Sequence, residues 1–486
     1  MHSLCLKDAS ELAGLVRTRK VSPVEVTSAF LVQIDRVNPM LNALCVTNHE
    51  QALADARQAE KRVLDSEALP PLHGVPIVFK DTTETKGIET TFGSRVFVGN
   101  IPEKDAIIVE RSRRAGAIIL GKAQSPEFAH SGFTRNLVYG ATPNPWDVSR
   151  TPGGSSGGSA VAVATAMTPI AEGADGGGSI RIPAACCGVF GLKPHPGRIP
   201  CGVMETYFEN MLCLGPITWT VRDAALLMSV WSGPDDRDPL SLPETGDDYL
   251  AALDDRVAGK RVAYTRDMGL VVTPEVTAVI DSAVKTLESL GCHIDVVEVE
   301  HGQDAIDAFN PLWWGMMASL FGRYVETHRH EMTRRVLEQI DFGQRMSAVE
   351  YQEAQILRSR YYDYLAGIME QYDYLVTPTL SITPPSVHSF SFGPEEIEGK
   401  QVDPQIGWFL TYPFNLTTHP AASVPVGFTD DGLPVGMQVV GKRFGEAAIL
   451  SLCAQLENAA PWTSTRPGLA MLNASQLGSD AMEIGE

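Results

Sequence analysis

Residues 151–200 read TPGGSSGGSAVAVATAMTPIAEGADGGGSIRIPAACCGVFGLKPHPGRIP. Apolar runs interrupt the glycines and serines, which favours tight turns inside a core over a flexible linker. Two Gly-Ser clusters place Ser155 and Ser179 at corresponding points, and Gly176–Gly178 directly precede Ser179. Glycines leave several backbone N–H groups unobstructed beside a hydroxyl, which is what an oxyanion hole requires. The stretch therefore indicates a catalytic serine.

The same stretch also satisfies a different catalytic pattern. Residues 153–157 (GGSSG) match the G-x-S-x-G nucleophile elbow of α/β-hydrolases. In that case Ser155 is the nucleophile, and a downstream histidine must act as its base. His328, His388 and His419 are available, but none lies in a signature of its own. This alternative requires a histidine, so replacing each histidine in turn would test it.

The Gly/Ser stretch resembles the signature of the amidase signature family of serine amidohydrolases, and the resemblance covers nearly the whole chain. The other matching segments are Gly74–Asp81 (GVPIVFKD), Gly140–Pro145, Gly215-Pro216, Arg222-Asp223, Tyr372-Asp373, Pro378-Thr379, Asn415 and Pro425–Gly427. The resemblance implies the α/β class: one large α/β/α sandwich around a mixed β-sheet, with N-terminal helices packed outside.

The resemblance also implies a Ser–cis-Ser–Lys triad. Ser179 matches the nucleophile, Ser155 matches a bridging serine held by a cis peptide bond after Gly154, and Lys80 matches the general base. The oxyanion would be held by the backbone N–H groups of Gly176, Gly177, Gly178 and Ser179. Supporting roles fall to Ser156, for hydrogen bonds, and to Asp175 and Arg181, as a structural pair that shapes the nucleophile loop.

Lys80 can act as a base only when its amine is neutral. A lysine is ordinarily charged at neutral pH, and burial lowers its pKa by disfavouring the charged form. Lys80 directly follows the apolar run Val75–Phe79, a predicted buried strand that would supply this desolvation. One departure from the family lies at Gly176, where the family commonly carries a side chain. We expect this change to reshape the loop without removing a backbone N–H.

Aromatic residues outside the signature suggest the kind of substrate. We expect a pocket lined by Met204, Tyr207, Phe208, Trp313, Trp314, Trp408 and Phe409. Such a pocket favours a hydrophobic or aryl amide, anilide or carbamate, with esterase activity on the side. The sequence therefore predicts a small-molecule amide substrate.

Two other functions compete with this one. The first is the glutaminase A subunit of a tRNA-dependent amidotransferase. That subfamily carries an acidic residue seven positions before the asparagine that matches Asn415, and this chain has Trp408 there. The second is a non-catalytic binding protein, but a decayed site would be expected to lose at least one of Lys80, Ser155 and Ser179.

Composition excludes several classes. The 486-residue chain has 39 basic and 59 acidic residues and a net charge of −20, unlike the basic surface of a nucleic-acid binder. Apolar runs fall short of the roughly 20 residues that a membrane helix needs, and we expect no signal peptide at the N-terminus.

The sequence also lacks the usual zinc motifs. Arg334 stands where the zinc motif beginning at His330 needs its second histidine, and no C-x-x-C pair occurs. We expect a cytoplasmic enzyme without metal or cofactor, and a homodimer is compatible with the sequence.

The remaining patterns suggest the organisation of the chain. Ser22-Pro23-Val24-Glu25 predicts a helix start, and the 3.6-residue spacing in 275–290 predicts a helix that stops at Gly291. Short apolar runs predict strands at 75–79, 117–120, 261–264, 293–299 and 374–376. We expect an N-terminal helical segment (1–70), an amidase domain (71–465) with a signature core (74–225) and a helical insertion (303–372), and a C-terminal tail (466–486).

Overall fold

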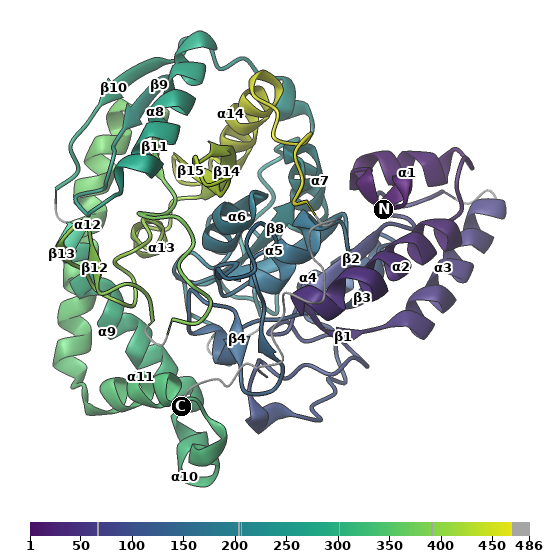
Figure 1. The fold of residues 1–486 in the computed structure, drawn as a ribbon, viewed down its shortest axis with the longest axis horizontal. Helices are drawn as coiled ribbons and strands as arrows, with labels where there is room; N and C mark the ends of the chain where they lie inside the picture. The colour runs from purple at the N-terminus through teal and green to yellow at the C-terminus, as the bar shows by residue number, and fades with distance from the viewer. Residues whose placement is uncertain (66–67, 203–204, 206, 301, 390–391, 469–486) are drawn as a thin grey trace.

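A mixed β-sheet forms the centre of the computed structural model, which describes residues 1–468 except 66–67, 203–204, 206, 301 and 390–391 (Figure 1). Its strands are β1 (Leu44–Thr47), β2 (Pro76–Lys80), β3 (Ile118–Ala123), β6 (Ile170–Asp175), β7 (Phe190–Lys193), β8 (Cys213–Thr218), β9 (Arg261–Tyr264), β10 (His293–Val296), β11 (Tyr374–Pro378), β14 (Ala421–Phe428) and β15 (Pro434–Gly441). The eleven strands follow the order β1-β3-β2-β6-β8-β7-β14-β15-β11-β9-β10.

The strand directions explain where chemistry can gather. Strand β2 pairs in parallel with both β3 and β6, so the carboxyl ends of these three strands meet at one edge. Strands β8, β7, β14 and β15 continue the sheet by antiparallel pairing, and β9 is parallel to β10 and β11. Two short ribbons lie outside the sheet, β4 (Arg135–Asn136) with β5 (Gly140–Ala141) and β12 (Glu396–Ile397) with β13 (Lys400–Gln401).

Helices cover the sheet. They are α1 (Ala9–Arg17), α2 (Pro23–Leu41), α3 (His49–Leu64), α4 (Ile107–Arg114), α5 (Gly157–Ala164), α6 (Arg181–Cys187), α7 (Val221–Trp231), α8 (Pro274–Ser289), α13 (Pro413–Leu416) and α14 (Glu446–Ala459). Helices α5 and α6 pack against each other and against central strands, and α7 and α14 form a second such pair. The expected sandwich with a mixed sheet is confirmed.

Local sequence signals account for several element boundaries. Helix α2 begins with a capping box in which the Ser22 side chain accepts from the Glu25 amide and the Glu25 carboxylate accepts from the Ser22 amide. Helix α8 buries the apolar face that the spacing predicts, and Gly291 beyond it adopts a left-handed φ of +88°. The expected strands are present as β2, β3, β9, β10 and β11.

The segment predicted as a helical insertion (303–372) contains α9 (Gly302–Phe321), α10 (Val325–His328), α11 (Arg334–Arg345) and α12 (Ala348–Gln371). Helix α9 packs against both α11 and α12. Figure 1 shows this region in green, at the end of the molecule opposite the purple N-terminal helices α1 to α3. Strand β1 was not predicted: it lies between α2 and α3 and extends the sheet through β3.

Candidate active site

Lys80 is the last residue of β2 and lies wholly out of solvent. All five residues of this strand are buried, because β2 has a neighbouring strand on each side and helices over it. Lys80 Nζ donates a hydrogen bond to Ser155 Oγ at 2.6 Å. The sequence pattern therefore predicted both the strand and the burial of its terminal lysine.

The surroundings of Lys80 make its neutral form easier to reach than in water. Burial lowers the pKa of the Lys80 amine to about 8, although the negative charges of Glu172 and Asp175 oppose this shift. Glu172 on β6 also accepts a hydrogen bond from the Lys80 backbone amide at 3.0 Å. Lys80 is thus held at both its backbone and its side chain, with a pKa suited to proton transfer near neutral to mildly alkaline pH.

Ser155 follows a cis Gly154–Ser155 peptide bond, as the family resemblance implies. A Cβ at Gly154 would lie 2.5 Å from the Ser131 carbonyl oxygen, so this position accepts only glycine. Thr134 stabilises the same loop, because its hydroxyl donates a hydrogen bond to the Gly153 carbonyl at 2.8 Å. Residues 131–134 therefore lie in direct contact with the backbone that carries Ser155.

The loop that connects β6 to α6 carries Ser179, which is half-buried. Asp175 ends β6 and accepts hydrogen bonds from the backbone amides of Gly178 at 2.7 Å and Ile180 at 3.2 Å. Its carboxylate also pairs with Arg181 through two hydrogen bonds of 2.9 and 3.0 Å. Asp175 therefore shapes the loop on both sides of Ser179.

The Asp175–Arg181 pair is fully buried. Burial by itself would raise the pKa of Asp175, but the Arg181 charge and its hydrogen bonds outweigh this effect and hold the pKa at about 2. Arg181 also donates to the Thr411 carbonyl, to Gln438 and to Asn415. The loop is consequently anchored to the far part of the chain around α13.

Asn415 on α13 and Thr411 just before this helix add further hydrogen bonds to the same loop. Asn415 Nδ2 donates to the Asp175 carbonyl at 3.0 Å and to its carboxylate at 2.9 Å. The Thr411 hydroxyl donates to the Gly177 carbonyl at 2.7 Å. Asn415 belongs to the segments that carry the family resemblance, whereas nothing in the sequence singled out Thr411.

Ser156 joins the two serine segments. Its backbone amide donates to the Ser179 carbonyl at 3.1 Å. Its side-chain hydroxyl accepts from the Ala174 amide at 3.2 Å and donates to the Ala174 carbonyl at 3.3 Å. The Ser156 amide therefore ties the segment that carries Ser155, which meets Lys80, to the loop that carries Ser179.

A hollow opens beside Ser179. Its lining residues are Ala129, His130, Ser131, Gly132, Gly177, Ser179, Ile182, Phe309, Trp313, Gln405, Ile406 and Phe409. Trp313 and Phe409 were predicted as pocket residues, and Phe309 and His130 were not. Phe309 and Trp313 lie one turn apart on α9, and their rings stack with centroids 5.9 Å apart and an interplanar angle of 14°.

Glycine at positions 176 and 177 makes room for these rings. A Cβ at Gly176 would lie 3.1 Å from Trp313 Cζ3, and a Cβ at Gly177 would lie 2.7 Å from Phe309 Cζ. At Gly176, where the family commonly has a side chain, the Trp313 ring of this chain occupies the space that such a side chain would need.

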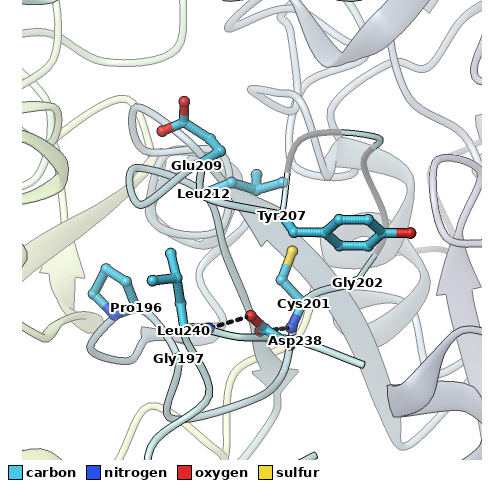
Figure 2. Close-up of a pocket in the computed structure, with 9 residues that line it drawn as sticks. All are labelled: Pro196, Gly197, Cys201, Gly202, Tyr207, Glu209, Leu212, Asp238 and Leu240. Carbon is cyan, nitrogen blue, oxygen red and sulfur yellow. Dashed lines mark hydrogen bonds between the residues drawn. The ribbon is translucent and has the colours of Figure 1, made fainter. Parts of the chain in front are cut away.

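The other aromatic residues lie elsewhere. Trp408 is fully buried and packs edge-on against Phe133, while Trp314 packs against Phe342 on α11. Phe208 is exposed. Tyr207 borders a separate hollow, lined also by Pro196, Gly197, Cys201, Gly202, Glu209, Leu212, Asp238 and Leu240 (Figure 2). The predicted residue Met204 lies outside the described residues.

The histidine alternative finds no geometric support. The Ser155 hydroxyl accepts from Lys80 Nζ, and His419 pairs with the Thr417 hydroxyl instead. Within the described residues, no three His, Cys, Asp or Glu side chains gather as a metal ion would require. No helix of the described chain is long and apolar enough to cross a membrane.

Comparison with known proteins agrees with this geometry. The family model named Amidase matches residues 25–450. An acylamidase of Rhodococcus erythropolis is 38% identical over 469 residues, which cover 96% of this chain and 98% of the relative. The A subunit of the glutamyl-tRNA(Gln) amidotransferase of Chloroflexus aggregans is 35% identical, covering 93% of this chain and 96% of the relative.

Solved structures give the same result. A bacterial aryl acylamidase of the amidase signature family matches with a TM-score of 0.89 and 33% identity, covering 94% of this chain and 97% of that chain. A 6-aminohexanoate cyclic dimer hydrolase matches with a TM-score of 0.86 and 29% identity, covering 96% of this chain and 99% of that chain. The chain therefore belongs to the amidase signature family and is an amidase, a hydrolase of C–N bonds.

Proposed function

We infer that this amidase hydrolyses hydrophobic or aryl amides, such as anilides and aryl carbamates, and has esterase activity on the side. One observation carries the inference: the hollow beside Ser179 combines Phe309, Trp313 and Phe409 and includes no Asp, Glu, Lys or Arg among its described lining residues. Aromatic and aliphatic walls favour burial of an apolar group from water. The similarity to an acylamidase and to an aryl acylamidase structure supports the same substrate class.

The same observation weighs against free glutamine as substrate. Glutamine carries an ammonium and a carboxylate, and a charge is costly to bury without a partner. The position at which the amidotransferase subfamily has an acidic residue is Trp408, which is buried against Phe133. The glutaminase component of a tRNA-dependent amidotransferase remains the alternative, since such proteins are also among the relatives.

The proposed chemistry proceeds through an acyl-enzyme. Neutral Lys80 takes a proton from Ser155, which in turn takes one from Ser179, because a serine hydroxyl is a weak nucleophile until a base removes its proton. Ser179 Oγ then forms a bond to the amide carbon, the C–N bond breaks, and the departing amine receives its proton through Ser155. Water hydrolyses the resulting ester and regenerates the Ser179 hydroxyl.

Backbone amides would stabilise the oxyanion that develops during this attack. The Gly178 amide already donates to Asp175 and is not free to bind the oxyanion. The amides of Gly176, Gly177 and Ser179 are therefore the candidate donors to the oxyanion. Gly178 instead contributes by fixing the loop, since its φ of +133° is a conformation that favours glycine.

A hydrolysis screen read by mass spectrometry tests the proposal. The panel contains aryl anilides, aryl carbamates, aryl esters, short aliphatic primary amides and glutamine, and Ser179→Ala protein runs beside the wild type. Turnover of aryl substrates that is lost in the variant is the expected result. Turnover of glutamine alone would favour the amidotransferase function, and activity that survives in the variant would exclude Ser179 as nucleophile.

A further inference from the structure

His130 is a buried polar side chain in the wall of an otherwise largely apolar hollow. It lies in the same lining as Ser179, and it is more than nine-tenths buried. Its Nδ1 lies 2.6 Å from the Glu127 carbonyl oxygen, whereas Nε2 has no hydrogen-bond partner among the described residues. Nε2 itself is sealed from solvent, and buried polar atoms are nearly always paired, so an unpaired one in a residue that lines this hollow points to a donor that the described residues do not supply.

The tautomer of His130 follows from this contact. A carbonyl oxygen only accepts, so the proton lies on Nδ1, and the neutral ring then presents Nε2 as an acceptor. Burial lowers the pKa of His130 to about 4, and the positive charges of Arg335 and Arg135 act in the same direction. At neutral pH the free atom is therefore an acceptor that needs a donor.

The turn that carries His130 is fixed on both sides. Glu127 precedes it in the short 3-10 helix η3 (Glu127–Ala129), and its buried carboxylate accepts from the Ser94 hydroxyl at 2.7 Å and from the Thr333 amide at 2.8 Å. Phe128 and Ala129 both adopt left-handed φ values, of +51° and +58°. Such values are uncommon for residues other than glycine, and they cluster where a structure holds a functional side chain in place.

The same turn leads directly into the catalytic segment. One residue after His130, the Ser131 carbonyl lies against Gly154, and Thr134 then bonds to the Gly153 carbonyl. The position of His130 is therefore coupled through the backbone to the loop that carries Ser155. The ring also meets Phe392 edge-on, with centroids 6.4 Å apart.

We propose that His130 is a specificity-determining residue whose Nε2 accepts a hydrogen bond from an N–H or O–H donor of the substrate. The inference rests on the proposed function, since it concerns the same hollow beside Ser179. A site with a buried acceptor discriminates against substrate analogues that lack a hydrogen-bond donor. When such an analogue binds, the acceptor is left buried without a hydrogen bond, and this lowers the affinity. The amidase would then prefer donor-bearing substrates over isosteres without a donor.

The experiment uses matched substrate pairs on the full-length protein. One pair is an anilide and its aryl ester, which differ in the scissile N–H, and a second pair is a 4-hydroxy and a 4-methyl anilide, which differ at the far end of the ring. An aliphatic amide and its ester form a third pair. The variants are His130→Leu, which removes the acceptor, and His130→Gln, whose amide oxygen can replace it, with thermal unfolding as the check on folding.

We expect His130→Leu to lower kcat/KM for the donor-bearing member of at least one pair by about tenfold relative to its partner, since a hydrogen bond is worth roughly 0.5–1.5 kcal/mol. His130→Gln should restore much of that ratio. The substrate pair whose kcat/KM ratio changes shows which N–H or O–H group of the substrate donates to His130. Equal losses for both members of every pair would overturn the assignment. Failure of the wild type on all aryl pairs would contradict the aryl substrate class instead, while the aliphatic pair would still report on His130.

Discussion

The Nζ atom of Lys80 lies 2.6 Å from the Oγ atom of Ser155, and both side chains are completely buried although they are 75 residues apart in the chain. This contact joins the end of a sheet strand to a loop from the signature stretch. Lys80 can receive a proton only while neutral, so under the proposed chemistry the activity of the enzyme depends on the protonation of this one buried amine.

The first prediction concerns pH. The pKa of Lys80 is lowered to about 8, so the fraction of neutral lysine rises with pH up to and through that value. We expect kcat/KM for an anilide to increase about tenfold per pH unit below pH 8 and to level off above it. A pH profile between 6 and 10, with an anilide that does not itself titrate in this range, measures the effect. A flat profile from 6 to 9 would contradict the role of Lys80.

The second prediction concerns the triad as a unit. Lys80→Met should lower kcat by about 10²–10⁴-fold, the range for loss of a general base. Adding Ser155→Ala to that variant should lower kcat little further, because residues that pass one proton act together. Single-turnover kinetics on the two single variants and the double variant measure this. Multiplicative losses would instead mean that the two side chains act independently.

The third prediction tests the aromatic wall. Trp313→Ala should raise KM for anilides by about tenfold and leave short aliphatic amides nearly unaffected, because only the aryl group would lose contact with the ring. Trp314→Ala is the control, since Trp314 packs against Phe342 and is not among the described lining residues, which it meets only through a 3.5 Å hydrogen bond to Gln405. Equal effects of the two substitutions on the KM for anilides would mean that Trp313 does not contact the aryl group of the substrate.

The fourth prediction concerns stability. Arg181→Met leaves the buried Asp175 carboxylate without its charged partner, so we expect the free energy of unfolding to fall by about 3–5 kcal/mol. Arg261→Met serves as the control: Arg261 pairs with Asp295 at 2.9 Å, but both side chains are about half exposed, and such pairs contribute at most about 1 kcal/mol. Urea denaturation of both variants compares them. Similar losses would show that burial does not distinguish the two pairs.

The sequence predicted those elements whose signals are local. The capping box at Ser22 and the apolar face of α8 depend on residues three or four positions apart, and both are present as predicted. The four residues of strand β1 at the edge of the sheet were not singled out by their sequence, although the equally short β9 and β10 were predicted beside the helix that became α8.

The binding hollow could be predicted only in part, because it is assembled from distant segments. Trp408 and Phe409 are adjacent in sequence, yet only Phe409 lines the hollow, while the Trp408 ring packs into the core on Phe133. An aromatic composition cannot tell which of two neighbours faces a pocket. His130 belongs to no motif, and only the structure shows that it lines the same hollow as Ser179 and that its Nε2 has no partner among the described residues.

The parallel pairing of β2 with β6 has a consequence for how this enzyme can change over time. Lys80 ends one strand and the loop of Ser179 leaves the other, so these two residues take their positions from the sheet. Phe309 and Trp313 belong instead to α9, which lies in the separate helical region. Under the proposed function, substitutions in that region would change which substrates bind, while the strands that position Lys80 and the loop of Ser179 stay the same.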